Sequence, residues 1–327
     1  MTEVIRKRKR DDVTLYILRR LAQLIPVLLL ASFIVFFIIH LIPGDPVQVM
    51  LGEGRFNQEA YELLRKQMGL DEPLYIQYLH WLGRMLHGDL GRSVQTQKPV
   101  LDTIIERYPA TIYLALASLL LGIVIAIPAG TIAAVKQNTL WDYSAMGFAL
   151  FGIAVPNFWL ALLLILTFGL YLGWFPTLGY ADPTVNFRAF LWHLTLPAIV
   201  LGTDLASTVT RYVRAEMLEQ LRLDYVRTAR AKGLPKRLVV YKHTLRNSLI
   251  AATTVIGLHV GRLLGGSTIV ETVFAWPGVA RLVLESVYSR DYPVLQGAVL
   301  LLGFTFVGVN LLVDILCKWL DPRIALK

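Results

Sequence analysis

Six long apolar stretches limit what this chain can fold into more than any other feature of its sequence. They lie at 21–42, 109–135, 144–170, 194–213, 246–270 and 294–317. About 20 apolar residues in a helix are enough to cross a bilayer. Only 17% of the residues are charged, against about 25% in soluble domains. Because backbone groups in lipid must find hydrogen bonds within their own segment, the stretches are expected to be helices. The sequence therefore predicts an all-α integral membrane protein with six transmembrane helices.

The basic residues predict how these helices are oriented. The tail 1–20 contains "RKRKR" at 6–10, and segment 211–246 carries ten Lys and Arg against three Asp and Glu. Segments rich in Lys and Arg stay on the cytoplasmic side. Both termini, including the tail 318–327, are therefore expected in the cytoplasm. We interpret the basic tail as an anchor against anionic lipid, with no role in binding nucleic acid.

The segment 43–108 follows the first apolar stretch and is expected outside the cytoplasm. Asn57 is a suitable cap for a helix that ends near Met68, and the aromatic-rich residues 74–88 predict a second helix. We expect a small folded cap on the outer membrane surface. The core domain then spans 109–317.

A short basic stretch, residues 224–233, lies between the fourth and fifth apolar stretches. Asp224 suits a helix N-cap, Gly233 suits the position after a helix end, and Pro235 prevents continuation. A helix this short is marginal alone and is expected to dock against something. A solvated basic linker is the alternative.

The same stretch resembles a family motif. "RTARAKG" (227–233) occupies the place of the cytoplasmic motif of ABC importer permeases, in its dipeptide and oligopeptide version, which also serves nickel and glutathione permeases. "HLIPGDP" (40–46) and "GGSTIVETVFAWPGVARLVLESVYSRDYPVLQG" (265–297) resemble two further signatures of this family, in the same order. Arg227 replaces the acidic residue of the motif, and Ala251 stands where a proline is common.

The resemblance implies a type I ABC importer permease fold and a division of labour between chains. Residues 224–233 would be the coupling helix that an ATPase subunit grips. The residues assigned to it are Asp224, Tyr225, Arg227, Thr228, Ala229, Arg230, Ala231, Lys232, Gly233 and Leu234. The chain itself has no Gly-Lys dipeptide, so it lacks a phosphate-binding P-loop. It is expected to be a transport subunit and not an enzyme, with ATP and Mg bound by its partners.

The resemblance also implies those partners and a location. They are two ABC ATPase subunits, a second permease that is usually a different chain, and an extracytoplasmic substrate-binding protein. The membrane would be the cell membrane of a bacterium or archaeon. Permeases of this type carry peptides, glutathione, nickel chelates and some sugars, and a peptide is the expected solute.

The outer signature has two readings. Its candidate residues are Glu271, Trp276, Pro277, Gly278, Arg290 and Asp291. In family terms they lie on the external face of the gate, where a substrate-binding protein docks. The alternative is a re-entrant loop held together by its own salt bridges.

Two charges fall inside predicted spans. Asp204 and Arg262 would each cost about 3 kcal/mol at the centre of a lipid-exposed helix, so each is expected to face protein or water. With Ser207 and His259 they form a candidate gate or lining of the translocation path. An ion pair that only fixes the helix register is the alternative.

Two other classes of protein fit less well. A secondary transporter or channel would carry ionisable residues through several spans, or two related halves. A membrane enzyme would need a metal or triad motif, and the six histidines form no such pattern.

Overall fold

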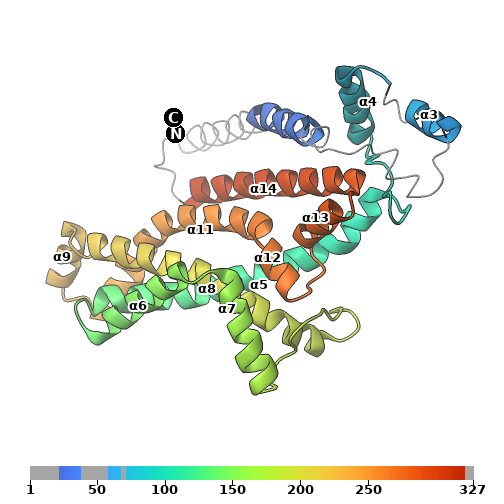
Figure 1. The fold of residues 1–327 in the computed structure, drawn as a ribbon. Coiled ribbons are helices and arrows are strands. Elements are labelled where there is room, and N and C mark those ends of the chain that lie inside the picture. The colour runs from blue at the N-terminus through green and yellow to red at the C-terminus, as the bar shows by residue number, and fades with distance from the viewer. Residues whose placement is uncertain (1–21, 38–57, 68–70, 321–327) are drawn as a thin grey trace. The chain divides into compact units, whose positions relative to one another are not determined.

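The computed structural model describes residues 22–37, 58–67 and 71–320, and it is helical throughout apart from turns and one isolated bridge between Arg92 and Pro99 (Figure 1). A first helix spans Ala22–Phe37. The others are α3 (Gln58–Gln67), α4 (Leu74–Leu86), α5 (Val100–Val135), α6 (Leu140–Ala154), α7 (Asn157–Leu164), α8 (Phe187–Gln220), α9 (Asp224–Ala231), α10 (Lys236–Leu238), α11 (Arg246–Gly266), α12 (Thr268–Val273), α13 (Val279–Tyr288) and α14 (Tyr292–Leu320), with π-helical segments η1 (Ile165–Tyr171) and η2 (Val239–Leu245). The all-α prediction is confirmed for these residues.

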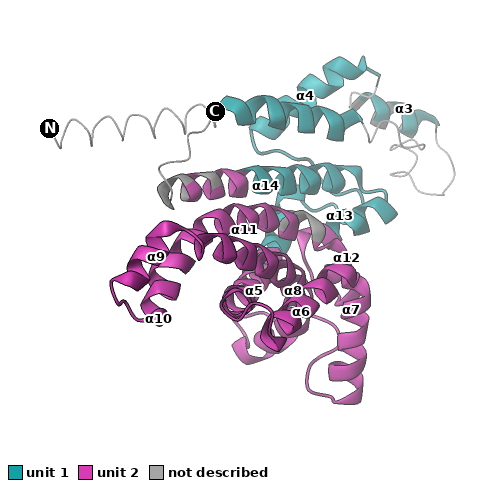
Figure 2. Ribbon diagram, turned by 90° about the vertical axis from the view of Figure 1, so that its left-hand side faces the viewer, with its two compact units in different colours: residues 1–109, 282–307 teal, residues 110–281, 308–327 magenta. Residues whose placement is uncertain are grey.

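The chain divides into two compact units (Figure 2). Unit 1 comprises 1–109 and 282–307, and unit 2 comprises 110–281 and 308–327. The predicted tail 1–20, the signature 40–46, the cap residues Asn57 and Met68, and residues 321–327 lie outside the described part.

Three described helices, α5, α8 and α14, are long and apolar enough to cross a membrane. A fourth span results if α6 and the segment after it count as one bent span, and the helix Ala22–Phe37 is apolar but shorter. The chain is therefore membrane-embedded, while the count of six spans stays a prediction.

Helices α5 and α14 extend beyond the predicted spans 109–135 and 294–317. Helix α5 begins at Val100, nine residues before the predicted start, and passes through Pro109 and Pro128 without a break. A proline is tolerated inside a membrane helix when its surroundings satisfy the freed carbonyl. Helix α14 runs to Leu320, so the first three residues of the predicted tail 318–327 are helical.

The predicted span 144–170 is bent, as Pro156 in its middle indicates. Helix α6 ends at Ala154, and the segment from Asn157 to Tyr171 continues at 105° to it. Pro156 explains the break, because its ring forces the preceding residue out of the helical region. Val155 accordingly has φ −83° and ψ 122°.

Unit 2 is built around α8, which packs closely against α5 and α6. A Cβ atom on Gly122 of α5 would collide with Leu205, and one on Gly152 of α6 would collide with Ser207. Small residues let helix backbones approach, which is how membrane helices gain van der Waals contact without a hydrophobic driving force. The glycines therefore fix where α5 and α6 cross α8.

In unit 1, α4 packs on the helix Ala22–Phe37 through aromatic rings. Tyr78 and Trp81 lie 5.5 and 5.6 Å from the ring of Phe36, and the hydroxyl groups of Tyr78 and Ser32 are hydrogen-bonded at 2.9 Å. Both helices predicted in segment 43–108 are present as α3 and α4. Their location on the outer membrane surface remains a prediction.

Candidate functional site

The predicted short basic helix is present as α9, and its end has the geometry that Gly233 predicts. Gly233 has φ +77°, in the left-handed region that favours glycine. Its N–H donates to the carbonyl of Arg230 (2.9 Å), and the N–H of Leu234 donates to that of Ala229 (3.3 Å). These two bonds form the Schellman motif, which ends a helix by satisfying its last carbonyls. The predicted N-cap is off by one residue, because Leu223 is the cap and Asp224 lies in the first turn.

Helix α9 docks against its own chain. Val226 is fully buried and Ala229 nearly so, and both pack on Val239 of η2, with Leu221 and Leu234 around them. This contact supplies the packing that a helix of eight residues lacks by itself. Ala229 consequently belongs to the docked face and is not available to an outside partner.

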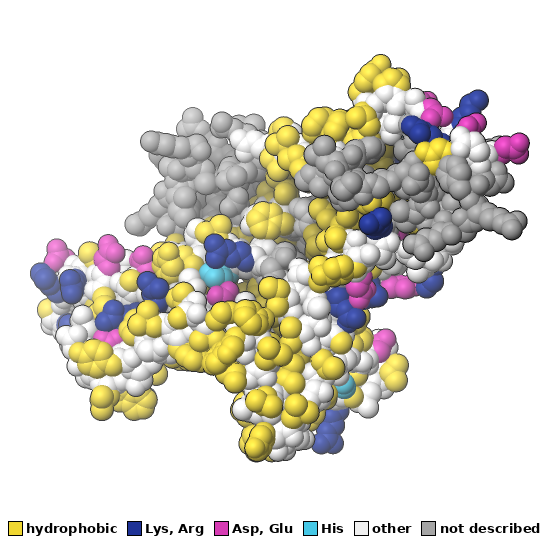
Figure 3. Space-filling model, viewed as in Figure 1, with side chains coloured by type: hydrophobic (Ala, Val, Ile, Leu, Met, Phe, Trp, Pro, Cys, Tyr) yellow, Lys and Arg dark blue, Asp and Glu magenta, His cyan; other side chains and the backbone are white. Residues whose placement is uncertain are grey.

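The opposite face of α9 is open to solvent and basic. The exposed residues of the predicted coupling set are Asp224, Tyr225, Arg227, Thr228, Arg230, Ala231, Lys232 and Gly233. Asp224 and Arg227 form a contact of 3.3 Å, but both side chains are so exposed that it adds little stability. In Figure 3 charged side chains of both signs gather at the end of unit 2 that carries α9, whereas hydrophobic side chains cover much of the rest of that unit's visible face.

Tyr225 links α9 to the two neighbouring helices. Its hydroxyl group donates to Oε1 of Gln220 at the end of α8 (2.7 Å) and accepts from Nδ2 of Asn247 in the first turn of α11 (3.2 Å). The sequence placed Tyr225 in the coupling set but gave no sign of these partners. One hydroxyl group therefore joins α9 to both α8 and α11.

An ion pair that the sequence analysis missed fixes α6 to α8. The guanidinium of Arg214 donates to both carboxylate oxygens of Asp142, Nε to Oδ1 (2.6 Å) and Nη2 to Oδ2 (2.8 Å). The backbone N–H of Asn138 also donates to Asp142 (3.0 Å). Arg214 was only one of ten basic residues in its segment, and nothing in the sequence pairs it with a carboxylate 72 positions away.

The first half of the outer signature forms a buried hydrogen-bond network in unit 2. The Glu271 carboxylate accepts from the hydroxyl groups of Ser267 (3.0 Å) and Thr111 (3.3 Å) and from the backbone N–H of Arg281 (2.8 Å). Gly278 lies so close that a Cβ atom on it would collide with the carboxyl group of Glu271. Glu271 therefore ties α12 to α5 and to the start of α13.

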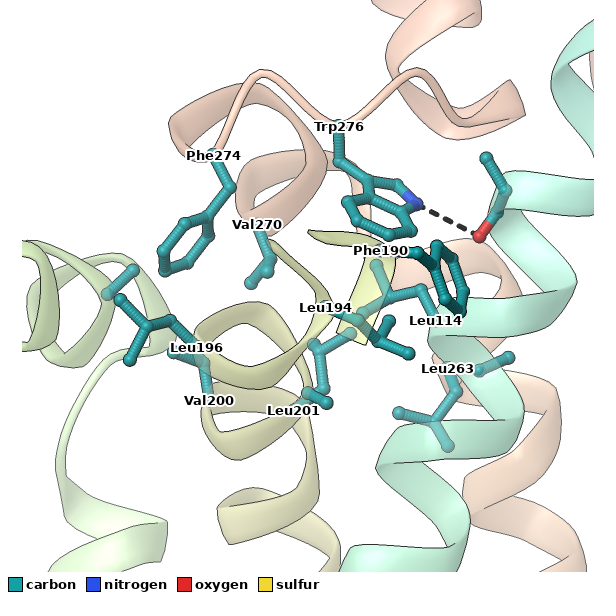
Figure 4. Close-up of a cluster of buried hydrophobic side chains, with 14 residues drawn as sticks. Leu114, Phe190, Leu194, Leu196, Val200, Leu201, Leu263, Val270, Phe274 and Trp276 are labelled. Carbon is teal, nitrogen blue, oxygen red and sulfur yellow. Dashed lines mark hydrogen bonds between the residues drawn. The ribbon is translucent and has the colours of Figure 1, made fainter. Parts of the chain in front are cut away.

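Trp276 anchors the same loop in the apolar core of unit 2 (Figure 4). Its ring is fully buried, Nε1 donates to the carbonyl of Ala110 (2.9 Å), and its centroid lies 4.9 Å from that of Tyr180 in an edge-to-face arrangement. Burial raises the pKa of the Tyr180 phenol above its ordinary value. Glu271, Trp276 and Gly278 are thus buried, Pro277 is half-buried, and the network fits a self-supported loop held by hydrogen bonds.

The second half of the signature, Arg290 and Asp291, lies in unit 1. Asp291 is buried and accepts hydrogen bonds from the Ser93 hydroxyl group and from the N–H groups of Val94 (3.2 Å) and Gln95 (3.4 Å). Arg290 is exposed, with φ +54°. Asp291 therefore holds the loop before α5, and Arg290 is the signature residue that remains open to a partner.

The four predicted gate residues do not share one surface. Ser207 is fully buried against Gly152 of α6, which removes it from any water-filled path. Asp204 is half-buried, Arg262 is exposed, and within the described residues no ion pair joins them. His259 is buried on α11, close enough to both for their charges to act on its ring. The structure thus separates Ser207 from the other three.

Long apolar helices and glycine-mediated helix crossings define a membrane-embedded helical protein with an exposed basic helix docked on η2. Residues 126–326 match the family described as the inner membrane component of binding-protein-dependent transport systems, and residues 13–115 match its N-terminal domain. The chain belongs to this family. It is the permease subunit of an ABC importer, a class of system that works with ATPase subunits and a substrate-binding protein.

Curated relatives match almost the whole chain. The dipeptide transport system permease protein DppB of Alkalihalophilus pseudofirmus is 42% identical, over 94% of this chain and 98% of its own length. The glutathione transport system permease protein GsiC of Escherichia coli O6:H1 is also 42% identical, over 95% and 99%.

A solved structure of the MetNI methionine ABC transporter has the same fold. Its chain aligns with a TM-score of 0.56 at 17% identity, covering 67% of this chain and 96% of that one. The predicted permease fold is confirmed at this level. The comparisons support the importer reading and give no support to a secondary transporter or channel.

Proposed function

We propose that this permease conducts di- and oligopeptides across the cell membrane of a bacterium or archaeon. We further propose that α9 couples the translocation path in the membrane to a separate ATPase subunit. The observation that carries the proposal is the two-sided character of α9. Its apolar face is packed on Val239 of the same chain, while its basic face is exposed. One side of this helix is fixed to the rest of the permease, and the other side is open to a separate subunit. Such a helix is suited to transmit a movement of that subunit to the permease.

The peptide assignment is supported by what the relatives share. One relative is a dipeptide permease, and an equally similar one is a glutathione permease. Glutathione is itself a small peptide with free carboxylates and an ammonium group. The chemistry common to both is a short, flexible chain with charges at its ends.

The proposed assembly contains this chain, a second permease of a different sequence, two ATPase subunits that bind ATP and Mg, and an extracytoplasmic binding protein. This chain would cross the membrane six times with both termini in the cytoplasm. Segment 43–108 would then lie outside, up to the point where α5 enters the membrane.

The test is reconstitution. The tagged chain is expected to co-purify with an ATPase and a second permease, and vesicles that contain the complex with its binding protein should accumulate a labelled dipeptide only when ATP is supplied. Vesicles with this chain alone serve as the control and should accumulate nothing. Uphill uptake by the chain alone would overturn the proposal.

A further inference from the structure

Helix α8 has one polar face that lies outside its crossings with α5 and α6. Gly202 and Leu205 face α5, and Thr203 and Ser207 face α6. The remaining face carries Asp204, Thr208, Arg211 and Ala215, spaced three or four residues apart, and all four are half-buried or exposed.

Helix α11, which packs beside α8, has a second polar face, on which the Thr254 hydroxyl group contacts Cys317 Sγ of α14 (3.9 Å). Asn247, Ala251, Thr254, Leu258 and Arg262 recur at intervals of three or four residues, and all are exposed. Only Leu258 among them is a large apolar residue. The inward side of α11 is different, since Ala252 and Leu263 belong to the apolar core.

Asp204 and Arg262 on these two faces have no partner that would neutralise them within the described residues. Both side chains lie near enough to the buried His259 for their charges to act on its ring. Figure 3 shows basic, histidine and acidic side chains together over α11 and α8, within an otherwise largely hydrophobic region. Lipid contact would cost about 3 kcal/mol for each charge. The two faces must therefore meet water or another polar molecule.

We propose that Asp204 and Arg262 bind the two ends of a zwitterionic peptide in transit, with the Asp204 carboxylate accepting hydrogen bonds from the peptide ammonium group and the Arg262 guanidinium donating to its terminal carboxylate. The site rests on the proposed function, whose substrate class it makes specific. Guanidinium groups bind carboxylates through two parallel hydrogen bonds, which gives geometric selectivity.

In the described part of the chain, Asp204 and Arg262 form no ion pair with each other. Each charge therefore remains available to the opposite charge of a solute. Arg262 is exposed, so water screens its charge and keeps binding weak. Weak binding is what a transport path needs, because the solute must also leave.

The test uses single cysteines beside the site in the complete reconstituted importer. Cys317 is the only cysteine of the chain and is replaced by Ser. Thr208→Cys and Leu258→Cys then place a thiol one turn from Asp204 and Arg262 without altering either charge. Leu120→Cys on α5 is the matched control, since Leu120 is 63% exposed on an apolar face with Leu116 and Val124.

A charged, water-soluble methanethiosulfonate reagent should label Thr208→Cys and Leu258→Cys but not Leu120→Cys. Dialanine, added with ATP and the binding protein, should slow the labelling at both positions several-fold. Asp204→Asn or Arg262→Gln, added to either cysteine variant, should abolish this protection.

Each other result contradicts the site in a distinct way. Labelling that is absent at both positions would mean that lipid or protein covers the two faces. Protection that persists without either charge would mean that the peptide binds elsewhere. If the unmodified importer shows no ATP-driven uptake of dialanine, the proposed function and the peptide site are both overturned. If it takes up dialanine but dialanine does not slow the labelling of either cysteine, the site alone is overturned.

Discussion

Asn247 of α11 donates a hydrogen bond of 3.2 Å to the hydroxyl group of Tyr225 in α9. The two residues are 22 positions apart. Tyr225 belongs to the exposed basic helix, and Asn247 belongs to the first turn of the adjoining helix α11. The same hydroxyl group donates to Gln220 at the end of α8. One phenol therefore joins α9 to both helices whose polar faces we assign to the path.

Removing this phenol oxygen should weaken coupling without preventing assembly. Tyr225→Phe keeps the ring but loses both hydrogen bonds, each worth about 1 kcal/mol, so the linkage of α9 to α8 and α11 should weaken by about five-fold or more. We expect fewer peptides imported per ATP hydrolysed in reconstituted vesicles. Tyr241→Phe is the control, because Tyr241 is 60% exposed, and it should behave as wild type. Unchanged stoichiometry in Tyr225→Phe would contradict the linkage.

The end of α9 should be sensitive to residue shape at one position. At Gly233 an added Cβ would meet no atom within 4 Å, so any effect must come from the backbone at φ +77°. Gly233→Val should cost about 1 to 2 kcal/mol in this conformation, whereas Gly233→Asn should cost less because asparagine visits the left-handed region. The valine variant should insert and hydrolyse ATP but import poorly. Normal uptake with valine would refute the coupling role.

The ion pair between Asp142 and Arg214 should stabilise the packing of α6 on α8. The Asp142 side chain is 2% exposed, so Arg214→Ala leaves a buried carboxylate without its partner and should cost about 3 kcal/mol or more. Thermal unfolding of the purified complex in detergent measures this loss. The double variant Asp142→Ala/Arg214→Ala removes both charges and should lose less than the sum of the single variants. Strict additivity would show that the pair is not coupled.

Gly278 should tolerate no side chain. In Gly278→Ala the new methyl group would displace the buried Glu271 carboxyl group from its three donors, which should cost about 1 to 3 kcal/mol. Gly147→Ala on α6 is the matched control, because an added Cβ there meets nothing within 4 Å. It should be neutral or stabilise by up to about 1 kcal/mol. Equal melting temperatures for the two variants would argue against the packing at Gly278.

Local chemistry in the sequence was enough to predict several elements. Long apolar stretches predicted the long helices, because backbone groups in lipid can be satisfied only within the helix. Gly233 and Pro235 predicted where α9 ends, because their backbone preferences are properties of single residues. Three short motifs in the right order indicated the family to which the chain belongs.

Tertiary structure decided what depends on distant partners. The sequence grouped Ser207 with Asp204, but packing against Gly152 turned Ser207 into a helix interface and left Asp204 half-buried. The sequence analysis assigned Glu271 and Trp276 to a signature expected on the external face of the gate, but in the folded chain both are buried within unit 2. Which face of a helix is covered, and which carboxylate meets which guanidinium, depends on how helices far apart in the chain cross one another. No local pattern encodes those crossings, since they follow from the close approach of small residues on separate helices.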